Sequence, residues 1–329
     1  MNEIRLGTIG SGPIVHSMLD AVSAVDNVRC CAVYSRTYET GRALAEKYHA
    51  EAVYTDLEAM FRDENLNFIY VASPNSLHYD QVKLALEHGK NVICEKPFCP
   101  RKEQAEELVA LAKEKGLFLV EAMPTDFLPN LEVIRAQLPK IGKLKLVLCN
   151  YTQYSSRFNL VLAGEKPNIF NPQYAAGCLM DINVYNLFLN VALFGKPNSA
   201  RYHANMYPGL ADTSGILTLE YDGFVSQCVG AKDCHGPSFV QIQGEKGYIY
   251  VPGSCNGMAQ VQVVTPVGTE TIDLQHGGDR LYFEVCGITD MVLRGDYEDC
   301  HRRLATTVDV IDTLEQARKT AGIRFPGDE

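Results

Sequence analysis

The residues of this chain most suited to catalysis lie in the tripeptide Glu95-Lys96-Pro97, which follows a short apolar run over residues 92–94. Such a run is typical of a buried strand, and proline cannot donate to a sheet ladder, so we expect the strand to end near Lys96. The carboxyl ends of parallel strands face the crevice where open α/β sheets bind ligands. There an ammonium could donate a hydrogen bond to a substrate hydroxyl or carbonyl oxygen. A solvated lysine at a strand end is the simpler alternative.

A glycine-rich turn near the N-terminus is the first candidate for cofactor binding. Gly10 and Gly12 stand between a predicted strand and a predicted helix, and Pro13 and Ile14 open that helix. Glycine lets the backbone approach a pyrophosphate closely, and the helix N-terminus offers unbonded N–H groups and the positive end of its dipole. The G-x-G-x-x-G pattern is incomplete because Val15 fills the third glycine position. A plain strand-to-helix turn is therefore the alternative.

The pair Ser35-Arg36 ends the second predicted strand. In a dinucleotide-binding fold this position, ~20 residues after the glycines, meets the adenosine ribose, and an acidic residue there selects NAD. A hydroxyl and a guanidinium instead complement a 2′-phosphate, so we expect NADP. Arg36 could also stack on the adenine, which would leave NAD possible.

A third polar loop follows the apolar strand predicted over residues 67–72. It contains Ser73, Pro74, Asn75 and His78. Because this strand should also end at the carboxyl edge of the sheet, we expect the loop to line the same crevice.

The first 122 residues predict a doubly wound parallel sheet of α/β class, covered by helices on both faces. Strands and helices alternate along this part of the chain. The predicted strands are 4–9, 28–34, 52–54, 67–72, 91–95 and 117–120, and the predicted helices are 14–25, 40–48, 56–61, 79–88 and 102–115.

Residues 123–329 predict an α+β domain with a mainly antiparallel open sheet. Strand patterns joined by short turns dominate here, and Tyr221-Asp222-Gly223 gives a strong hairpin signal. The predicted strands are 145–154, 199–206, 213–221, 224–231, 239–244, 247–251, 260–265 and 270–273, and the predicted helices are 128–138, 177–194, 281–294 and 302–320. We expect this domain to bind the substrate and to form a sheet-based dimer contact.

Composition limits the class of partner. The 329 residues carry a net charge of −10, which disfavours a non-specific nucleic-acid surface. No apolar run approaches the ~20 residues that span a bilayer, and the N-terminus does not read as a signal peptide. Eleven cysteines without a C-x-x-C pair suggest buried, reduced thiols. We therefore expect a cytoplasmic protein with no membrane or nucleic-acid partner and no metal.

Together these motifs make the chain resemble the glucose–fructose oxidoreductase / inositol dehydrogenase (Gfo/Idh/MocA) family, in the branch that includes dihydrodiol dehydrogenase. The resemblance runs nearly end to end. It rests on G-T-I-G-S-G at Gly7–Gly12, S-P-N-S-L-H at Ser73–His78, E-K-P at Glu95–Pro97, E-A-M at Glu121–Met123 and G-C-L-M-D-I-N-V-Y at Gly177–Tyr185.

The resemblance implies a nicotinamide cofactor with a substrate hydroxyl beside its reactive carbon. It makes Lys96 the catalytic lysine and directs Asp181 and Tyr185 toward the substrate, and their spacing of four places them on one helical face. Glu95 would help to bind the nicotinamide ribose or position Lys96. The residues expected to contact ribose and phosphate are Ser73, Asn75 and His78.

Two departures from the family pattern bear on the substrate. Asn183 stands where relatives usually have glycine, and a side chain there could narrow the pocket. Residues 168–171 contain no arginine where many relatives have one, which points to a less anionic substrate.

The sequence therefore predicts an NAD(P)-dependent oxidoreductase that transfers a hydride between nicotinamide and a secondary alcohol or carbonyl of a sugar, polyol or diol. Either Lys96 or Tyr185 could be the proton donor. The alternatives are an NAD-dependent glycosidase of the same fold and a non-catalytic NADP(H) redox sensor. A homodimer or a dimer of dimers is expected from the family.

Overall fold

The computed structural model describes residues 1–328 and divides the chain into two compact units. The first unit comprises Met1–Met123 and Leu281–Val308. The second comprises Pro124–Arg280 and the chain from Asp309 onward. The long helix α10 (Tyr297–Thr320) begins in the first unit and ends in the second.

The first unit is built on a parallel sheet of six strands in the order β3-β2-β1-β4-β5-β6. The strands are β1 (Ile4–Ile9), β2 (Val28–Tyr34), β3 (Ala52–Tyr54), β4 (Phe68–Val71), β5 (Asn91–Glu95) and β6 (Leu119–Ala122). Every residue of β4, β5 and β6 is buried, as expected for strands covered on both faces. The prediction of a doubly wound sheet is confirmed.

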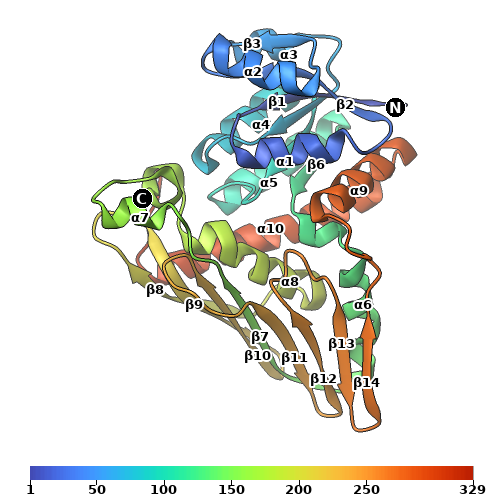
Figure 1. The fold of residues 1–329 in the computed structure, drawn as a ribbon, viewed down its shortest axis with the longest axis vertical. Coiled ribbons are helices and arrows are strands. Elements are labelled where there is room, and N and C mark those ends of the chain that lie inside the picture. Colours follow the sequence, from blue (N-terminus) through green and yellow to red (C-terminus); the bar gives the residue numbers. More distant parts are fainter. Residues whose placement is uncertain (329) are drawn as a thin grey trace. The chain divides into compact units, whose positions relative to one another are not determined.

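Helices follow the strands of this unit in alternation (Figure 1). They are α1 (Pro13–Val22), α2 (Tyr38–Tyr48), α3 (Leu57–Phe61), α4 (His78–Glu87) and α5 (Lys102–Lys115), with the short turn η1 (Asn75–Leu77) before α4. Helix α9 (Arg280–Arg294) belongs to this unit but comes later in the chain, after β14. Local sequence explains several ends. Asp56 caps α3 by accepting from the Ala59 N–H, and Gly116 ends α5 in the left-handed conformation.

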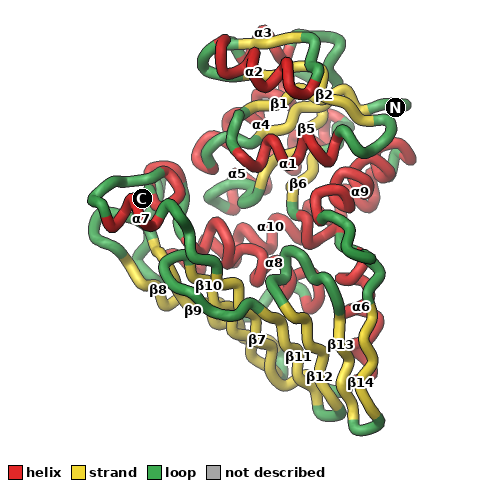
Figure 2. Tube along the Cα trace, in the orientation of Figure 1, coloured by secondary structure: helices red, strands yellow, loops and turns green. Residues whose placement is uncertain are grey.

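The second unit is built on an open sheet of eight strands in the order β14-β13-β12-β11-β7-β10-β9-β8 (Figure 2). The strands are β7 (Leu144–Thr152), β8 (Ser199–Met206), β9 (Asp212–Tyr221), β10 (Phe224–Ala231), β11 (Phe239–Gly244), β12 (Gly247–Pro252), β13 (Val261–Thr265) and β14 (Gly268–Ile272). All neighbouring pairs are antiparallel except β7 with β10. The predicted mainly antiparallel sheet is thus confirmed.

One face of this sheet packs against α8 (Val184–Phe194), and the other exposes apolar side chains. Asn186 and Asn190 on α8 bond Val229 and Cys228 of β10. Four strands each contribute one exposed apolar residue to this other face: Leu146 on β7, Ile216 on β9, Val225 on β10 and Tyr248 on β12.

The remaining helical segments of the second unit are short. They are η2 (Pro124–Phe127), α6 (Pro129–Gln137), η3 (Leu138–Ile141), α7 (Phe158–Leu162), η4 (Asn168–Phe170), η5 (Pro172–Tyr174) and η6 (Leu179–Asn183), the last of which is a π-helical turn.

One prediction about apolar segments needs correction. Within the described residues, the helical stretch Pro172–Phe194 is long and apolar enough to meet the length and composition of a membrane span. Most of that stretch is buried inside the structure, which is how the core helix of a soluble protein looks. The stretch is therefore explained by packing under the sheet.

Some strands and helices begin at other residues than the sequence predicts. The last parallel strand lies two residues later than predicted, at Leu119–Ala122, which places Glu121 inside the strand. Helix α10 begins at Tyr297, five residues before the prediction. Phe118 stacks on Tyr297 with ring centroids 4.1 Å apart, a long-range contact that no local pattern reveals.

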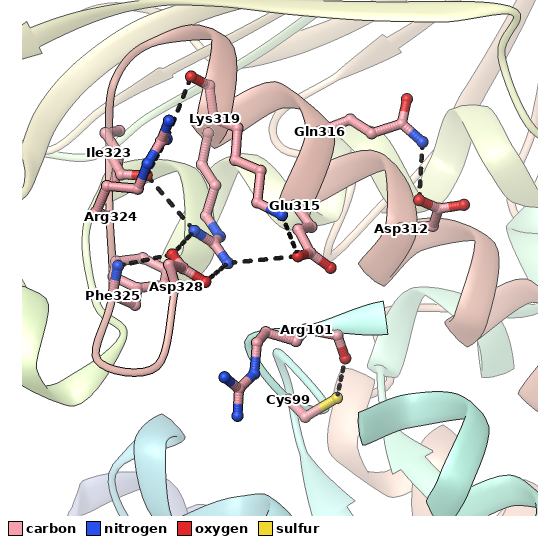
Figure 3. Close-up of polar contacts among 11 residues, drawn as sticks. Cys99, Arg101, Asp312, Glu315, Gln316, Lys319, Ile323, Arg324, Phe325 and Asp328 are labelled. Carbon is pink, nitrogen blue, oxygen red and sulfur yellow. Dashed lines mark hydrogen bonds and ion pairs between the residues drawn. The ribbon is translucent and has the colours of Figure 1, made fainter. Parts of the chain in front are cut away.

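The C-terminal segment is held by a buried arginine. Arg318 is completely buried, forms an ion pair with Asp328, and lies 4.6 Å from the ring centroid of Phe325. Glu315 accepts from Lys319 on the same helix, and Figure 3 shows these two side chains with Phe325 and Asp328. A buried charge is tolerated because its partner is also buried.

Candidate active site

Four of the predicted site segments meet at one edge of the parallel sheet. The register pairs β1 with β2 and β4, and β4 with β5, all in the same direction. The loops that carry Gly10, Arg36, Ser73 and Lys96 therefore leave the sheet at its carboxyl edge. The strand order reverses between β1 and β4, which is where sheets of this type bind nucleotides.

The glycine turn fits a pyrophosphate. Gly10 has φ of +117°, and a Cβ on it would lie 2.6 Å from the Ala72 carbonyl oxygen, so only glycine suits this position. A Cβ on Gly12 would meet no atom within 4 Å. Helix α1 begins with Pro13, has no side-chain cap and carries no acidic residue in its first turn, while Ile14 is half-buried. These features leave a helix N-terminus suited to an anion.

The second loop presents a cation to the same edge. Ser35 is buried and its N–H bonds the Tyr54 carbonyl, whereas Arg36 is exposed. Helix α2 starts just after them, at Tyr38. An exposed guanidinium beside a helix N-terminus suits a phosphate group.

Three buried side chains fix the backbone that carries Lys96. The Tyr70 hydroxyl donates to Glu95 Oε1 at 2.6 Å, and the His78 ring lies 3.1 Å from the Pro97 carbonyl oxygen. The Phe98 N–H donates to Glu121 Oε1 at 3.0 Å. We call Tyr70, His78 and Glu121 the lysine clamp. Lys96 itself is half-buried, and these contacts hold the loop from which its side chain extends.

Two carboxyl groups act on the Tyr70 hydroxyl of the clamp. Burial raises the pKa of Tyr70 well above its usual value, and the neighbouring Glu95 and Glu284 carboxyl groups raise it further, so this hydroxyl stays a donor. Glu284 comes from α9 and is completely buried. The second oxygen of Glu121 accepts from Thr307 at 2.9 Å, which ties α10 to the clamp.

His78 is completely buried, and both of its ring nitrogens face main-chain oxygens. The second nitrogen lies 2.9 Å from the Ser73 carbonyl, so the ring links the loop after β4 to the loop after β5. Burial and then the charge of Lys96 lower the pKa of His78, although the carbonyl contacts oppose this shift. His78 would therefore act on a bound cofactor through these loops. Ser73 donates to Gln81, and Pro74 and Asn75 start the turn η1.

In the second unit, Asp181 lies in the π-helical turn η6 and pairs with Lys232. Lys232 is 5% exposed, so this ion pair is largely shielded from solvent. Asp212 holds the start of the same helical segment, because its Oδ2 accepts from the Leu179 N–H at 2.7 Å. Burial raises the pKa of Asp212 to about 6, against the opposing hydrogen bonds and the charge of Lys232.

Tyr185 lies one turn further along this helical segment and is buried. Arg280 donates to its hydroxyl at 3.4 Å, and the Tyr151 ring is tilted against it with centroids 5.9 Å apart. A guanidinium beside a phenol stabilises negative charge on its oxygen. Such a tyrosine is suited to proton transfer.

The expectation that Asn183 narrows a pocket is wrong. Asn183 is completely buried, donates to the Cys228 carbonyl and accepts from Asn186. Opposite it stands Gly230, where a Cβ would lie 2.7 Å from that of Asn183. Asn183 thus packs the helical segment onto β10, and this contact is possible because Gly230 has no side chain.

The sequence interpretation missed Tyr70, Lys232, Asp212 and Arg280. Tyr70 stands in an apolar strand and reads as core, and Lys232 directly follows β10. The one available signal was the position of Asp212, Lys232 and Arg280 at strand or helix ends, and Tyr70 gave none. Residues 168–171 carry no arginine, but Arg280 at the start of α9 donates to the Tyr185 hydroxyl.

The fold and these residues define a nucleotide-binding oxidoreductase with a Rossmann domain. Residues 4–122 match the family model of the oxidoreductase family with an NAD-binding Rossmann fold, GFO_IDH_MocA, and residues 136–250 match the GFO/IDH/MocA C-terminal domain. The chain belongs to the Gfo/Idh/MocA family, and the predictions of this family and of an oxidoreductase are confirmed.

Relatives match over nearly the whole chain. The uncharacterized oxidoreductase YgjR of Escherichia coli is 35% identical, with 99% of this chain and 98% of the relative covered. The scyllo-inositol 2-dehydrogenase (NADP(+)) IolU of Bacillus subtilis is 32% identical, with 99% of each covered. The 3-ketoreductase KijD10 of Actinomadura kijaniata, solved with NADP and TDP-benzene, has a TM-score of 0.84 at 21% identity, covering 97% of this chain and 98% of its own, and so supports the fold.

Proposed function

We propose that this protein is an NADP(H)-dependent oxidoreductase that interconverts a secondary alcohol and a ketone on a polyol, sugar or diol-like ring. The observation that carries the proposal is the lysine clamp, which fixes Lys96 at the carboxyl edge of a nucleotide-binding sheet. The name of IolU, an NADP(+)-linked dehydrogenase of a cyclic polyol, supports this substrate class.

The nucleotide is assigned to the domain of residues 1–122 and the substrate to residues 123–329. Gly10, Gly12, Pro13 and Ile14 would hold the pyrophosphate by backbone groups. Ser35 and Arg36 would hold the 2′-phosphate that distinguishes NADP from NAD. The segments around Ser73-Pro74-Asn75 and Glu95-Lys96 would border the nicotinamide half.

The bound cofactor supplies or accepts a hydride. In reduction, negative charge grows on the substrate oxygen, and the Lys96 ammonium stabilises this charge by a hydrogen bond and by electrostatic attraction. Either Lys96 or Tyr185 delivers the proton. Arg280 orients the Tyr185 hydroxyl by donating a hydrogen bond to it. Asp181, held by Lys232, would accept hydrogen bonds from neighbouring hydroxyls and so orient the ring.

The test follows the absorbance of reduced nicotinamide with purified protein, either cofactor and a panel of inositols, sugars and cyclic diols. The proposal expects net cofactor turnover with at least one polyhydroxylated ring, and faster turnover with NADP than with NAD. Release of free sugar from a glycoside without net cofactor turnover would instead support the NAD-dependent glycosidase. Tight cofactor binding without either activity would support the redox sensor.

The exposed apolar residues Leu146, Ile216, Val225 and Tyr248 support a dimer formed through the open sheet face. We further propose a cytoplasmic homodimer, or a dimer of dimers, with no membrane or nucleic-acid partner. Comparing the sedimentation of Val225→Glu with that of the wild type tests whether this sheet face forms the dimer. A charge at Val225 should favour the monomer.

A further inference from the structure

The second unit contains a cavity of about 460 Å³ between two loops. One loop follows β12 and the other leads from β14 into α9. This volume lies in the range of small-molecule sites and far exceeds the ~30 Å³ of one water. We call it the loop pocket. Its polar lining side chains are Ser254, Gln275, Asp279 and Arg280.

The loop pocket connects directly to the proposed catalytic tyrosine. Arg280 lines the pocket, and its guanidinium also donates to the Tyr185 hydroxyl at 3.4 Å. A ligand in the pocket would therefore contact the same cation that supports proton transfer.

A second connection uses different residues. Ser254 lines the pocket and donates to Asn256 Oδ1 at 2.6 Å, and Asn256 donates to the Tyr151 hydroxyl at 3.0 Å. The Tyr151 ring in turn contacts the Tyr185 ring. Asn256 is 8% exposed, so this route is a built part of the structure rather than a surface contact.

The pocket also contains a side chain with an unmet hydrogen-bonding need. Gln275 is 6% exposed, and its Nε2 donates to the Gly257 carbonyl at 2.8 Å. Its Oε1 is buried and has no hydrogen-bond partner among residues 1–328. Because this oxygen is itself buried, the Gln275 side chain must rotate to bond a ligand hydroxyl, and relief of the ~1–3 kcal/mol cost of an unpartnered buried acceptor favours that rotation.

We propose that the loop pocket is a substrate subsite that binds a hydroxylated substituent, such as a second sugar ring, attached to the ring that reacts at Tyr185. This inference rests on the proposed function for the identity of the reacting ring. The enzyme then prefers glycosylated polyols or oligosaccharides to the free ring.

The lining chemistry selects a neutral, hydroxyl-rich ligand. Gln275, Asp279 and Ser254 offer acceptors and Arg280 offers donors, since the Ser254 hydroxyl proton is already donated to Asn256. A hydroxyl both donates and accepts, so neighbouring hydroxyls on a ring can meet these groups together. The opposite charges of Asp279 and Arg280 adjoin in sequence, which disfavours a strongly anionic or cationic substituent.

The test fills the pocket without changing the tyrosine or its partners. Ala259 lines the pocket and is exposed, so Ala259→Trp should fold while excluding the substituent. Val267→Trp is the matched control, because Val267 is 98% exposed and outside the pocket. The probes are myo-inositol against an O-galactosyl-myo-inositol and glucose against maltose. Turnover is followed as kcat/KM with NADP, and binding by calorimetry with NADP present.

We expect the wild type to prefer the glycosylated member of a pair at least tenfold in kcat/KM. Ala259→Trp should lose that preference at least tenfold, and Val267→Trp should keep it. Equal rates for both members in the wild type, or an unchanged preference in Ala259→Trp, would overturn the subsite.

Binding separates this inference from the proposed function. If no probe is turned over but the glycosylated probe binds the wild type at least tenfold more tightly than Ala259→Trp, the subsite stands and the oxidoreductase assignment fails. If turnover of free rings occurs and the glycosylated probes neither react better nor bind more tightly, the subsite fails and the assignment stands. Absence of both turnover and binding would overturn the subsite as well.

Discussion

Asp212 gives the second unit a pH-dependent stability that one substitution should remove. Its carboxyl group is 1% exposed and accepts from the Tyr202 hydroxyl at 2.6 Å and from the Leu179 N–H. Burial raises its pKa from the ordinary aspartate value of 3.8 to about 6. The folded protein thus holds this proton more tightly than the unfolded chain does. Its contribution to stability is complete below pH ~4 and is lost as the pH rises through about 6.

The size of the effect follows from the shift. A rise of roughly 2 pKa units corresponds to about 3 kcal/mol, because each unit is worth 1.36 kcal/mol. Asp212→Asn keeps an oxygen that can accept both hydrogen bonds, yet it cannot ionise. Between pH 4 and pH 8 the free energy of unfolding of the wild type should therefore fall by ~2–3 kcal/mol relative to the variant.

The assay is denaturant unfolding followed by circular dichroism at several pH values, for the wild type and for Asp212→Asn. Taking the difference removes every other titrating group that the two proteins share. Glu220→Gln, which removes an exposed carboxylate from the same strand β9, controls for the loss of one acid. If the free energy of unfolding of the wild type minus that of Asp212→Asn stays constant from pH 4 to pH 8, the reasoning about Asp212 is refuted.

Three further substitutions test the site. Tyr70→Phe removes the donor to Glu95, so the free energy of unfolding should fall by ~1–3 kcal/mol and kcat by about tenfold. The control Tyr54→Phe loses a hydrogen bond to Asp63 and should leave kcat unchanged. Arg36→Ala should raise the KM for NADP at least tenfold more than that for NAD, and equal changes would remove the 2′-phosphate assignment. Lys232→Met should lower kcat/KM for the substrate at least tenfold, with partial rescue by Lys232→Arg; full activity in Lys232→Met would show that its ion pair with Asp181 is dispensable.

Much of the fold followed from local pattern. Apolar runs that end in glycine, proline or polar loops located the strands of the parallel sheet, and they placed Lys96 at a carboxyl edge. This works because strand burial and strand termination depend on nearby residues. The displaced starts of β6 and α10 lie beside Phe118 and Tyr297, where a contact between distant residues decides the boundary.

The partners of the candidate site residues depended on the folded structure. Arg280 lies 95 positions from Tyr185, and Lys232 lies 51 positions from Asp181. No periodicity connects residues at such distances, and a buried polar pair looks like an ordinary surface residue in sequence. The π-helical turn around Asp181 was likewise hidden, since its residues also fit an α-helix.

The central claim is that the Lys96 ammonium stabilises the negative charge on the substrate oxygen during nicotinamide-dependent reduction, with the proton coming from Lys96 or Tyr185. The direct measurement compares kcat with NADP(H) and a polyhydroxylated substrate for the wild type and Lys96→Ala, together with cofactor affinity by titration. The account predicts that kcat falls at least ~10²-fold, while the Kd of the cofactor stays within about tenfold. Turnover that is unchanged in Lys96→Ala would contradict it.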